Sequence, residues 1–370
     1  MSLSDNLPKQ MSKQLVKDSL GDLVTFKQHP RPWHMPLMVA IAVSFPVFLG
    51  AWLDQLAIGL LASLGSMVVL NLPYEGSFFF RMAQVLACSF GFVASFAMGL
   101  IAHLVPVLVL PLVFVVTFWV TLFSRYFRLG PPGGLFILMA TSIAVFMPIQ
   151  PNELPYYTGL VGLGCLFSGV IACVYTIFIF LNKPSVAPLE FHYQPAQFAD
   201  SVVIAATSTV SLAVALELNM PRPYWVLVGC YVVISGMSFL SMWHKQVQRI
   251  VGTTTGMGVA WLIFMLQPDP WGVAALLLVL IFLIETVIVR NYVLAATFIT
   301  PLTILIAEYS HPDVDAVAIL SQDVMGIISA RFWDTVLGCV IGIIGGFIMH
   351  TEAYRAKLHI FERWVLGLFK

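Results

Sequence analysis

Arg249–Gly258 places a cation beside small and hydroxyl-bearing residues at the start of an apolar run. On a helix, Gly252 and Gly256 share one face, where a second helix can approach closely, and Thr253 adds a hydroxyl group beside them. An arginine within an apolar segment is costly to bury, so this segment suits the route of an anion. Close packing between two helices explains the glycines as well, and the sequence leaves both interpretations open.

A related pattern runs from Arg331 to Gly338. Arg331 and Asp334 are three residues apart and share a helix face, with Thr335 next to them. A charged pair inside a membrane segment is a functional candidate by default, and burial disfavours the charged form of a carboxyl group, which makes Asp334 a candidate proton carrier or gate. The alternative is a structural salt bridge at the outer interface. Together, 249–256 and 331–338 indicate two mouths of one pathway.

The segment 291–308 carries polar groups around a proline. Asn291, Thr297 and Thr300 precede Pro301, which frees a backbone carbonyl, and broken helices are where transporters bind substrates and ions. Proline kinks without a ligand are the alternative. Glu285 is the other intramembrane acid, and we expect it to reach the inner surface or to pair with Arg290 rather than to transfer protons.

The first half contributes a cationic turn. Arg125 and Arg128 precede the stiff loop Gly130–Gly134, which would line an inner vestibule and concentrate anions there. An ordinary turn with anchoring arginines is the alternative. Tyr224 and Trp225 are expected in the aromatic belt of the outer interface, with stacking on an aromatic substrate as the weaker interpretation.

Composition sets the class of protein. The chain is 59% hydrophobic and 10% charged, against about 45–50% and 25% for soluble domains. The net charge is zero, so nucleic-acid binding has no support. Neither a phosphate-binding loop nor a metal-ligand cluster occurs in the sequence, so we expect no cofactor, no metal and no enzyme activity. The five cysteines lie in apolar runs and are expected to be core residues.

The apolar runs predict an all-α integral membrane protein, because each is continuous and about 17–25 residues long. With the amino terminus inside, 16 of the 18 Lys and Arg residues fall on the inner side, which predicts that both termini are cytoplasmic. The twelve expected spans are 36–53, 56–72, 79–103, 106–124, 133–149, 156–181, 198–218, 223–242, 247–267, 271–289, 291–308 and 329–349.

Six plus six spans predict two parallel repeats facing a central cavity. Gln84-Val85 and Phe136-Ile137 recur 162 residues later, and Gly164-Cys165 recurs as Gly338-Cys339. The expected organisation is a cytoplasmic tail (1–35), a first six-helix repeat (36–182), a cytoplasmic linker (183–197), a second repeat (198–349) and an interfacial amphipathic helix (350–370).

The ordered set Tyr224-Trp225, Arg249-x-x-Gly-Thr-x-x-Gly256, Asn291-Tyr292 to Thr300-Pro301, and Arg331-x-x-Asp-Thr-x-x-Gly338 resembles the fusaric acid resistance family. The resemblance covers about 222–349 and is looser in the first half. It implies bacterial inner-membrane exporters of aromatic carboxylic acids, distantly similar to plant malate channels, that work beside a periplasmic adaptor protein. Large cytoplasmic domains are usual in that family, and 183–195 and 351–370 leave no room for them, so we expect a membrane-only member.

We therefore expect a proton-driven exporter of small organic anions, with aromatic carboxylates as the favoured substrates. A passive anion channel and a non-transporting scaffold or assembly subunit of an efflux complex are the alternatives. The lipid bilayer is a necessary partner, the adaptor is implied by the resemblance, and a homo-oligomer is left open.

Overall fold

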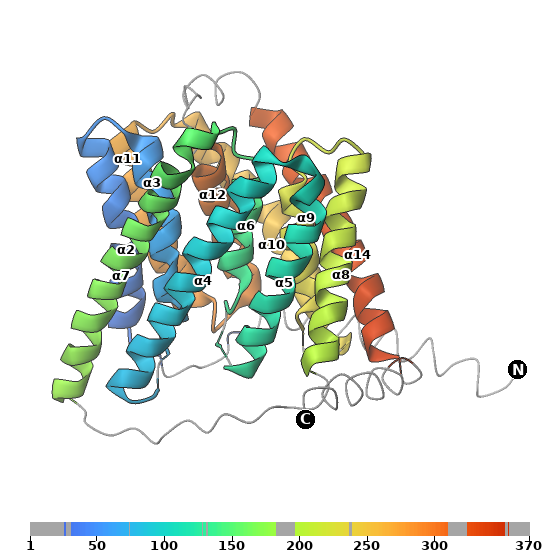
Figure 1. Ribbon diagram of the computed structural model, residues 1–370. Helices are drawn as coiled ribbons and strands as arrows, with labels where there is room; N and C mark the ends of the chain where they lie inside the picture. Colours follow the sequence, from blue (N-terminus) through green and yellow to red (C-terminus); the bar gives the residue numbers. More distant parts are fainter. Residues whose placement is uncertain are drawn as a thin grey trace, which may run out of the picture.

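The protein is a bundle of α-helices in the computed structural model (Figure 1), which describes residues 26, 31–73, 75–127, 129–130, 132–182, 197–236, 239–309, 324–351 and 354. These residues form twelve α-helices and no strand. The first six are α2 (His34–Trp52), α3 (Leu56–Ser66), α4 (Phe78–Leu104), α5 (Val109–Tyr126), α6 (Leu135–Val145) and α7 (Leu154–Asn182). The second six are α8 (Gln197–Glu217), α9 (Tyr224–Ile234), α10 (Phe239–Met265), α11 (Pro270–Val287), α12 (Tyr292–Tyr309) and α14 (Val324–His350).

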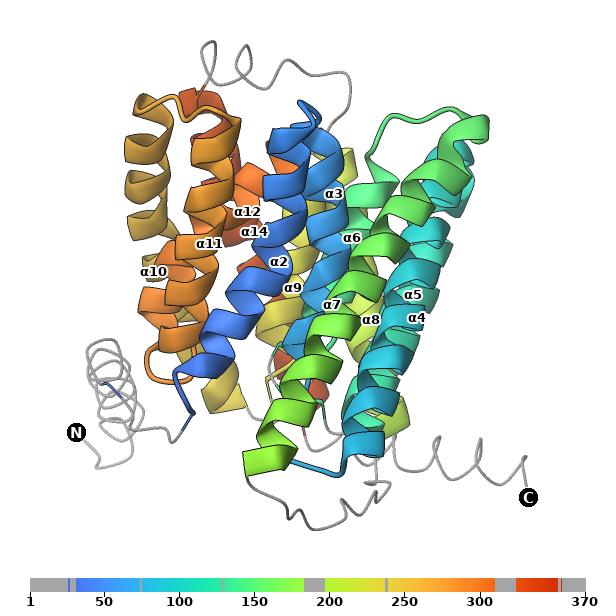
Figure 2. The same cartoon turned by 90° about the vertical axis from the view of Figure 1, so that its left-hand side faces the viewer.

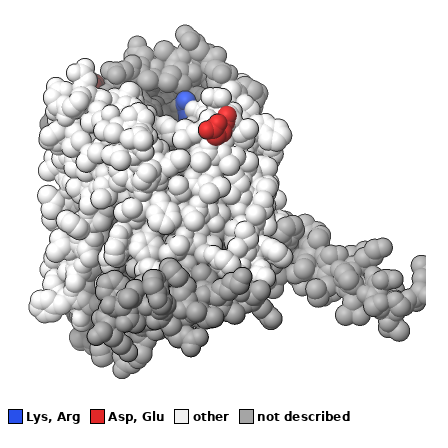
Figure 3. Space-filling view, turned by 45° about the vertical axis from the view of Figure 1, so that its right-hand side comes forward, with Lys and Arg blue, Asp and Glu red and all other residues white. Residues whose placement is uncertain are grey.

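The predicted all-α membrane fold is confirmed. Seven of the described helices are long and apolar enough to cross a membrane, and four others are apolar but shorter. In Figure 3, the described part of one side wall is uncharged except near its upper edge, where charged residues are seen. Twelve complete crossings stay a prediction. The described residues leave out Arg128 and most of three predicted segments: the tail, the linker and the terminal amphipathic helix.

Several helix ends differ from the approximate expected bounds. Helix α9 ends at Ile234, against about 242, and α6 ends at Val145, against about 149. Helix α10 begins at Phe239, against about 247, and α14 begins at Val324, against about 329. Hydropathy marks where side chains become polar, whereas a helix continues as long as its backbone hydrogen bonds do.

Two short helices occupy the interior. All eleven residues of α9 are buried, and so are nine of the eleven residues of α6. The two helices pack against each other, and α9 also packs against α8 and α14, while α6 packs against α4 and α5. In Figure 1, both run behind the longer helices of the front face. A helix that is apolar all round is stable only when other helices surround it.

The order of helix lengths and partners is similar in the two halves of the chain. Helices α3 and α9 have 11 residues each, α4 and α10 have 27, and α5 and α11 have 18. Helix α3 packs against α7 as α9 packs against α14, and α4 packs against α6 as α10 packs against α12. Helices α6 and α12 differ, with 11 and 18 residues, and the six-helix repeat stays a prediction.

The α3–α7 and α9–α14 contacts use corresponding glycines. A methyl group on Gly164 of α7 would collide with the Ala62 carbonyl and lie 3.0 Å from the Ser66 nitrogen. A methyl group on Gly338 of α14 would collide with the Val226 carbonyl and lie 3.0 Å from the Cys230 nitrogen. Small residues allow backbones to approach this closely within membranes. The recurring Gly-Cys dipeptide therefore marks a helix crossing.

The two halves meet through four helix pairs. Helix α2 packs on α11, α5 on α8, α6 on α9 and α3 on α12. Figure 2 shows α2 beside α11, and Figure 1 shows α5 beside α8. Each contact joins one helix of the first half to one of the second, so neither half is complete without the other.

We expect Gly338→Val to destabilise the protein, because its side chain has no space against Val226 and Cys230. Overpacking of this kind costs about 1–3 kcal/mol. The measurement is the thermal unfolding midpoint of the purified protein in lipid nanodiscs. Gly169→Val is the matched control, since a methyl group there meets no atom within 4 Å. Equal midpoints for the two variants would contradict the close crossing.

Candidate anion site in the second half

Arg249 lies inside the bundle rather than at the lip of a helix. It is the tenth residue after Phe239, so it lies about 15 Å along α10 from the start of that helix. Its side chain is 7% exposed. The side chain is therefore enclosed by neighbouring helices, and α10 begins well before it. At this depth an arginine needs a counter-charge.

No such counter-charge faces Arg249 among the residues that the structure describes. The ion pairs found there are Arg31–Glu285 and Arg125–Asp200, and neither involves Arg249. Its buried Nε has no hydrogen-bond partner among described groups, and Cys339 of α14 is the residue with which it interacts electrostatically. An uncompensated buried charge costs several kcal/mol. A bound anion would remove that cost.

The glycines beside Arg249 serve helix packing. A methyl group on Gly252 would lie 2.5 Å from the Ala296 side chain, and one on Gly256 would lie 2.5 Å from the Thr297 carbonyl. The stripe is therefore filled by α12, as the packing interpretation predicted. Thr253, in contrast, is buried on the same helix as Arg249, one turn further along.

The polar residues of α12 are bonded mainly within the helix. Asn291 caps it, since its Oδ1 accepts from the Leu294 N–H at 3.0 Å. Thr300 donates to the Ala296 carbonyl at 2.9 Å, and Thr297 lies 2.7 Å from the Thr255 hydroxyl of α10. Helix α12 continues past Pro301 to Tyr309. Its hydroxyls line the α10–α12 contact, and no broken helix is formed there.

Arg331 is buried against an aromatic ring. Its guanidinium carbon lies 3.3 Å from the centre of the Trp225 ring, and its Nη2 donates to the Thr303 hydroxyl at 3.3 Å. A cation over an indole face is stabilised by the ring quadrupole, more strongly when water is absent. Tyr224 and Trp225 are both buried, so the predicted aromatic belt is wrong at these residues. Trp225 joins α9 to α14.

Asp334 is fully buried, with 0% exposure. Neither carboxylate oxygen accepts a hydrogen bond from a described residue, and the described ion pairs do not include an Arg331–Asp334 bridge. The two side chains interact electrostatically without a direct ion pair, and the structural alternative stays a prediction. Thr335 donates to the Arg331 carbonyl at 2.8 Å. Asp334 is the tenth residue after Val324, about 15 Å along α14.

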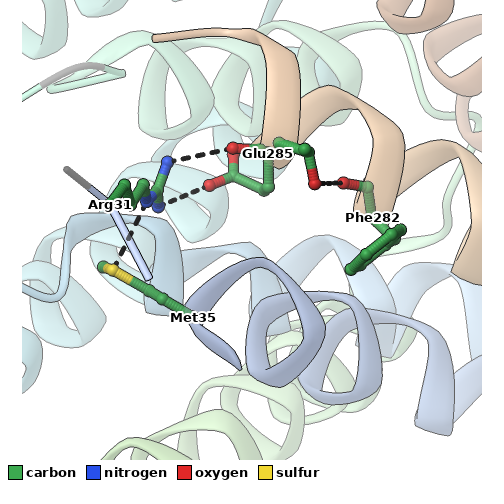
Figure 4. Close-up of polar contacts among 5 residues, drawn as sticks. Arg31, Met35, Phe282 and Glu285 are labelled. Carbon is green, nitrogen blue, oxygen red and sulfur yellow. Dashed lines mark hydrogen bonds and ion pairs between the residues drawn. The ribbon is translucent and has the colours of Figure 1, made fainter. Parts of the chain in front are cut away.

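Glu285 pairs with a residue that sequence analysis did not select. Arg31, just before α2, donates from Nη2 to the Glu285 Oε2 at 2.7 Å and from Nη1 to the Glu285 carbonyl at 3.3 Å. Figure 4 shows this contact, with the Arg31 Nε also directed at the Met35 sulfur. The expected pairing with Arg290 is wrong, because the end of α11 faces the start of α2.

Arg125 makes the corresponding contact on the other side of the bundle. Its Nη1 lies 2.6 Å from the Asp200 Oδ2 of α8. Asp200 in the first turn of α8 and Arg31 before α2 were both missed by sequence analysis. The sequence did contain a signal for this pair, because Arg125 and Asp200 carry opposite charges and are expected at the same depth. Arg125 is therefore matched within the protein and is not available as an unpaired anion attractor.

Buried helices, internal ion pairs and an apolar wall are the features of a helical membrane protein. Comparison with known proteins agrees: residues 208–345 match the family described as fusaric acid resistance protein-like. This part of the chain is similar to that family, and the resemblance found in the sequence is confirmed over these residues. The match includes Arg249, α12, Arg331 and Asp334.

A curated relative supports the same class. The chain is 30% identical over 154 residues to the uncharacterized membrane protein YvaC of Bacillus subtilis (strain 168). The aligned part is 42% of this chain and 23% of the relative, so the chain spans about a quarter of that protein's length. No solved structure matches the chain.

We expect Glu285→Gln to lower the unfolding midpoint, because it leaves the Arg31 guanidinium without its carboxylate. Breaking a buried pair costs about 3–5 kcal/mol, whereas replacing both partners by apolar residues is nearly neutral. The double variant Arg31→Met, Glu285→Met should therefore recover most of the loss in the same thermal unfolding measurement. Asp200→Asn should cost less, since the side chains of the Arg125–Asp200 pair are 24% and 17% exposed, against 14% and 6% for Arg31 and Glu285. A double variant as unstable as Glu285→Gln would contradict the ion-pair assignment.

Proposed function

We propose that the protein exports small organic anions across the bacterial inner membrane, with aromatic carboxylates as substrates and the proton gradient as the driving force. The observation that carries the proposal is Arg249, a buried arginine deep in α10 with no carboxylate partner among the described residues. A carboxylate is a matching ligand for a guanidinium group, because the two groups can form paired, charge-assisted hydrogen bonds.

Asp334 supports proton coupling. It is buried on α14, the helix that also carries Cys339 near Arg249. Protonation would make Asp334 neutral, and deprotonation would place a negative charge on the same helix as Cys339. A bound anion and a charged Asp334 would repel each other, so a change in the protonation of Asp334 would change the affinity of the site for the anion. This change in affinity is the proposed link between proton movement and anion movement.

The route follows α10, α12 and α14. Arg249 and Thr253 would hold the anion from α10, and Thr297 and Thr300 would offer hydroxyls from α12. Arg331, Thr335 and Asp334 would form the gate towards the predicted outer side. Gly252, Gly256 and Pro301 shape this route through packing. A periplasmic adaptor protein and a homo-oligomer remain proposals without a structural observation.

We expect Arg249→Gln to reduce anion flux at least tenfold, because a hydrogen bond to a charged group contributes about 1.5–3 kcal/mol. The measurement is flux of radiolabelled benzoate and of acetate into proteoliposomes. Arg290→Gln is the matched control, since Arg290 is an exposed arginine and should keep full flux. Equal flux in both variants would exclude Arg249 as the anion site. Absence of flux in the unmodified protein would favour a non-transporting scaffold.

We expect Asp334→Asn to retain benzoate flux down its own gradient and to lose stimulation by a pH gradient, because asparagine cannot carry the proton. Flux with and without an imposed pH gradient is compared for both proteins. Thermal unfolding shows whether the variant is folded. Stimulation that persists in Asp334→Asn would remove Asp334 from the coupling step. An unmodified protein that ignores the pH gradient would be a passive channel.

A further inference from the structure

A large apolar cleft opens between α4 and α5, outside the proposed anion route. Its volume is about 760 Å³, and its lining runs from Phe80 to Met98 on α4 and from Val115 to Phe127 on α5, with Ile137 of α6 behind them. The two walls belong to helices whose outer faces carry large exposed apolar side chains. The cleft therefore opens to the hydrocarbon layer. Its size lies within the range of small-molecule sites, about 300–1,000 Å³.

One wall of this cleft is a row of aromatic rings on α5. Trp119 and Phe123 are stacked, with centroids 5.4 Å apart and an angle of 23° between the rings. Phe127 continues the row at 6.3 Å from Phe123. These three side chains lie four residues apart, on one helix face, and Trp119 and Phe123 remain 48% and 51% exposed. A planar aromatic molecule can add to such a row by stacking or by edge contacts.

The opposite wall leaves space for a ring. Gly91 of α4 lines the cleft, and a methyl group built on it meets no atom within 4 Å. Phe90 lies next to it and is largely exposed. Gly91 thus differs from the tightly packed glycines of the helix crossings. The gap lies opposite α5, the helix that carries the aromatic row.

We propose that this cleft binds the uncharged, protonated form of an aromatic carboxylic acid taken from the lipid layer. The cleft lining contains no Lys, Arg, Asp or Glu among the described residues, so it offers a carboxylate no compensating charge. The ring would lie against Trp119 and Phe123. The choice of an aromatic acid rests on the proposed function, whereas the preference for an uncharged, ring-bearing molecule rests on the cleft.

The test is photolabelling of the full chain in phosphatidylcholine nanodiscs with methyl 4-benzoylbenzoate, an uncharged probe of this class. Labelled peptides are located by mass spectrometry. We expect labels on α4 and α5, and at least fivefold less labelling in Gly91→Trp, whose side chain fills the gap. Gly169→Trp is the matched control, because Gly169 lies on α7 and also has open space around it. It should label like the unmodified protein.

Two further arms define the ligand. Methyl benzoate should compete with the probe, whereas methyl octanoate at the same concentration should not. The charged probe 4-benzoylbenzoate at pH 8 should label less than its ester.

Equal competition by methyl octanoate would overturn the proposal, because it would make the cleft a groove for lipid chains. Unchanged labelling in Gly91→Trp would overturn it as well, and Gly91→Leu repeats that comparison if the tryptophan variant is unstable. Labelling is measured without transport, so a protein that labels as expected but carries no benzoate would disprove the proposed function alone. Flux that depends on Arg249 without labels in the cleft would disprove the cleft site alone.

Discussion

Charges inside this bundle must be balanced by groups within the protein, because the surrounding layer of side chains is apolar and offers no polar partner. Arg31 and Arg125 meet this requirement through Glu285 and Asp200. Arg331 meets part of it through the Trp225 ring. Arg249 remains buried without an ion-pair partner among the described residues. Asp334 interacts electrostatically with Arg331 and Arg222, but its carboxylate oxygens accept no hydrogen bond from a described residue.

Two ion pairs join the two halves at one end of the bundle. The Arg31–Glu285 and Arg125–Asp200 pairs each link a helix of the first half with a helix of the second. Both occur where α2 and α8 begin and where α5 and α11 end, which places them at one end of the bundle. The first half supplies the cation in both pairs. It comes from just before the start of α2 in one pair and from the end of α5 in the other. Two contacts at similar depths therefore hold the halves together without a shared sequence motif.

The anion route and the lipid-facing cleft require different physical environments. Arg249 stabilises a charged ligand inside the bundle, and the aromatic row on α5 stabilises an uncharged ring at the edge of the bundle. An organic acid exists in both forms and exchanges between them by gaining or losing a proton. The chain thus contains one environment suited to each form, separated by the buried helices α6 and α9.

The sequence by itself determined the class of fold, because long apolar runs can cross a hydrocarbon layer only as helices. It also located Arg249, Arg331 and Asp334, since charged residues are conspicuous in apolar segments. It could not decide their depth or their partners. Helix α10 begins before the apolar run does, so Arg249 lies within the helix rather than at its start. The partners Asp200, Arg31 and Trp225 are remote in sequence, and only the packing of α8, α2 and α9 brings them to Arg125, Glu285 and Arg331. The local sequence determines that a charge lies in an apolar segment, whereas the tertiary structure decides which group offsets the free-energy cost of burying it.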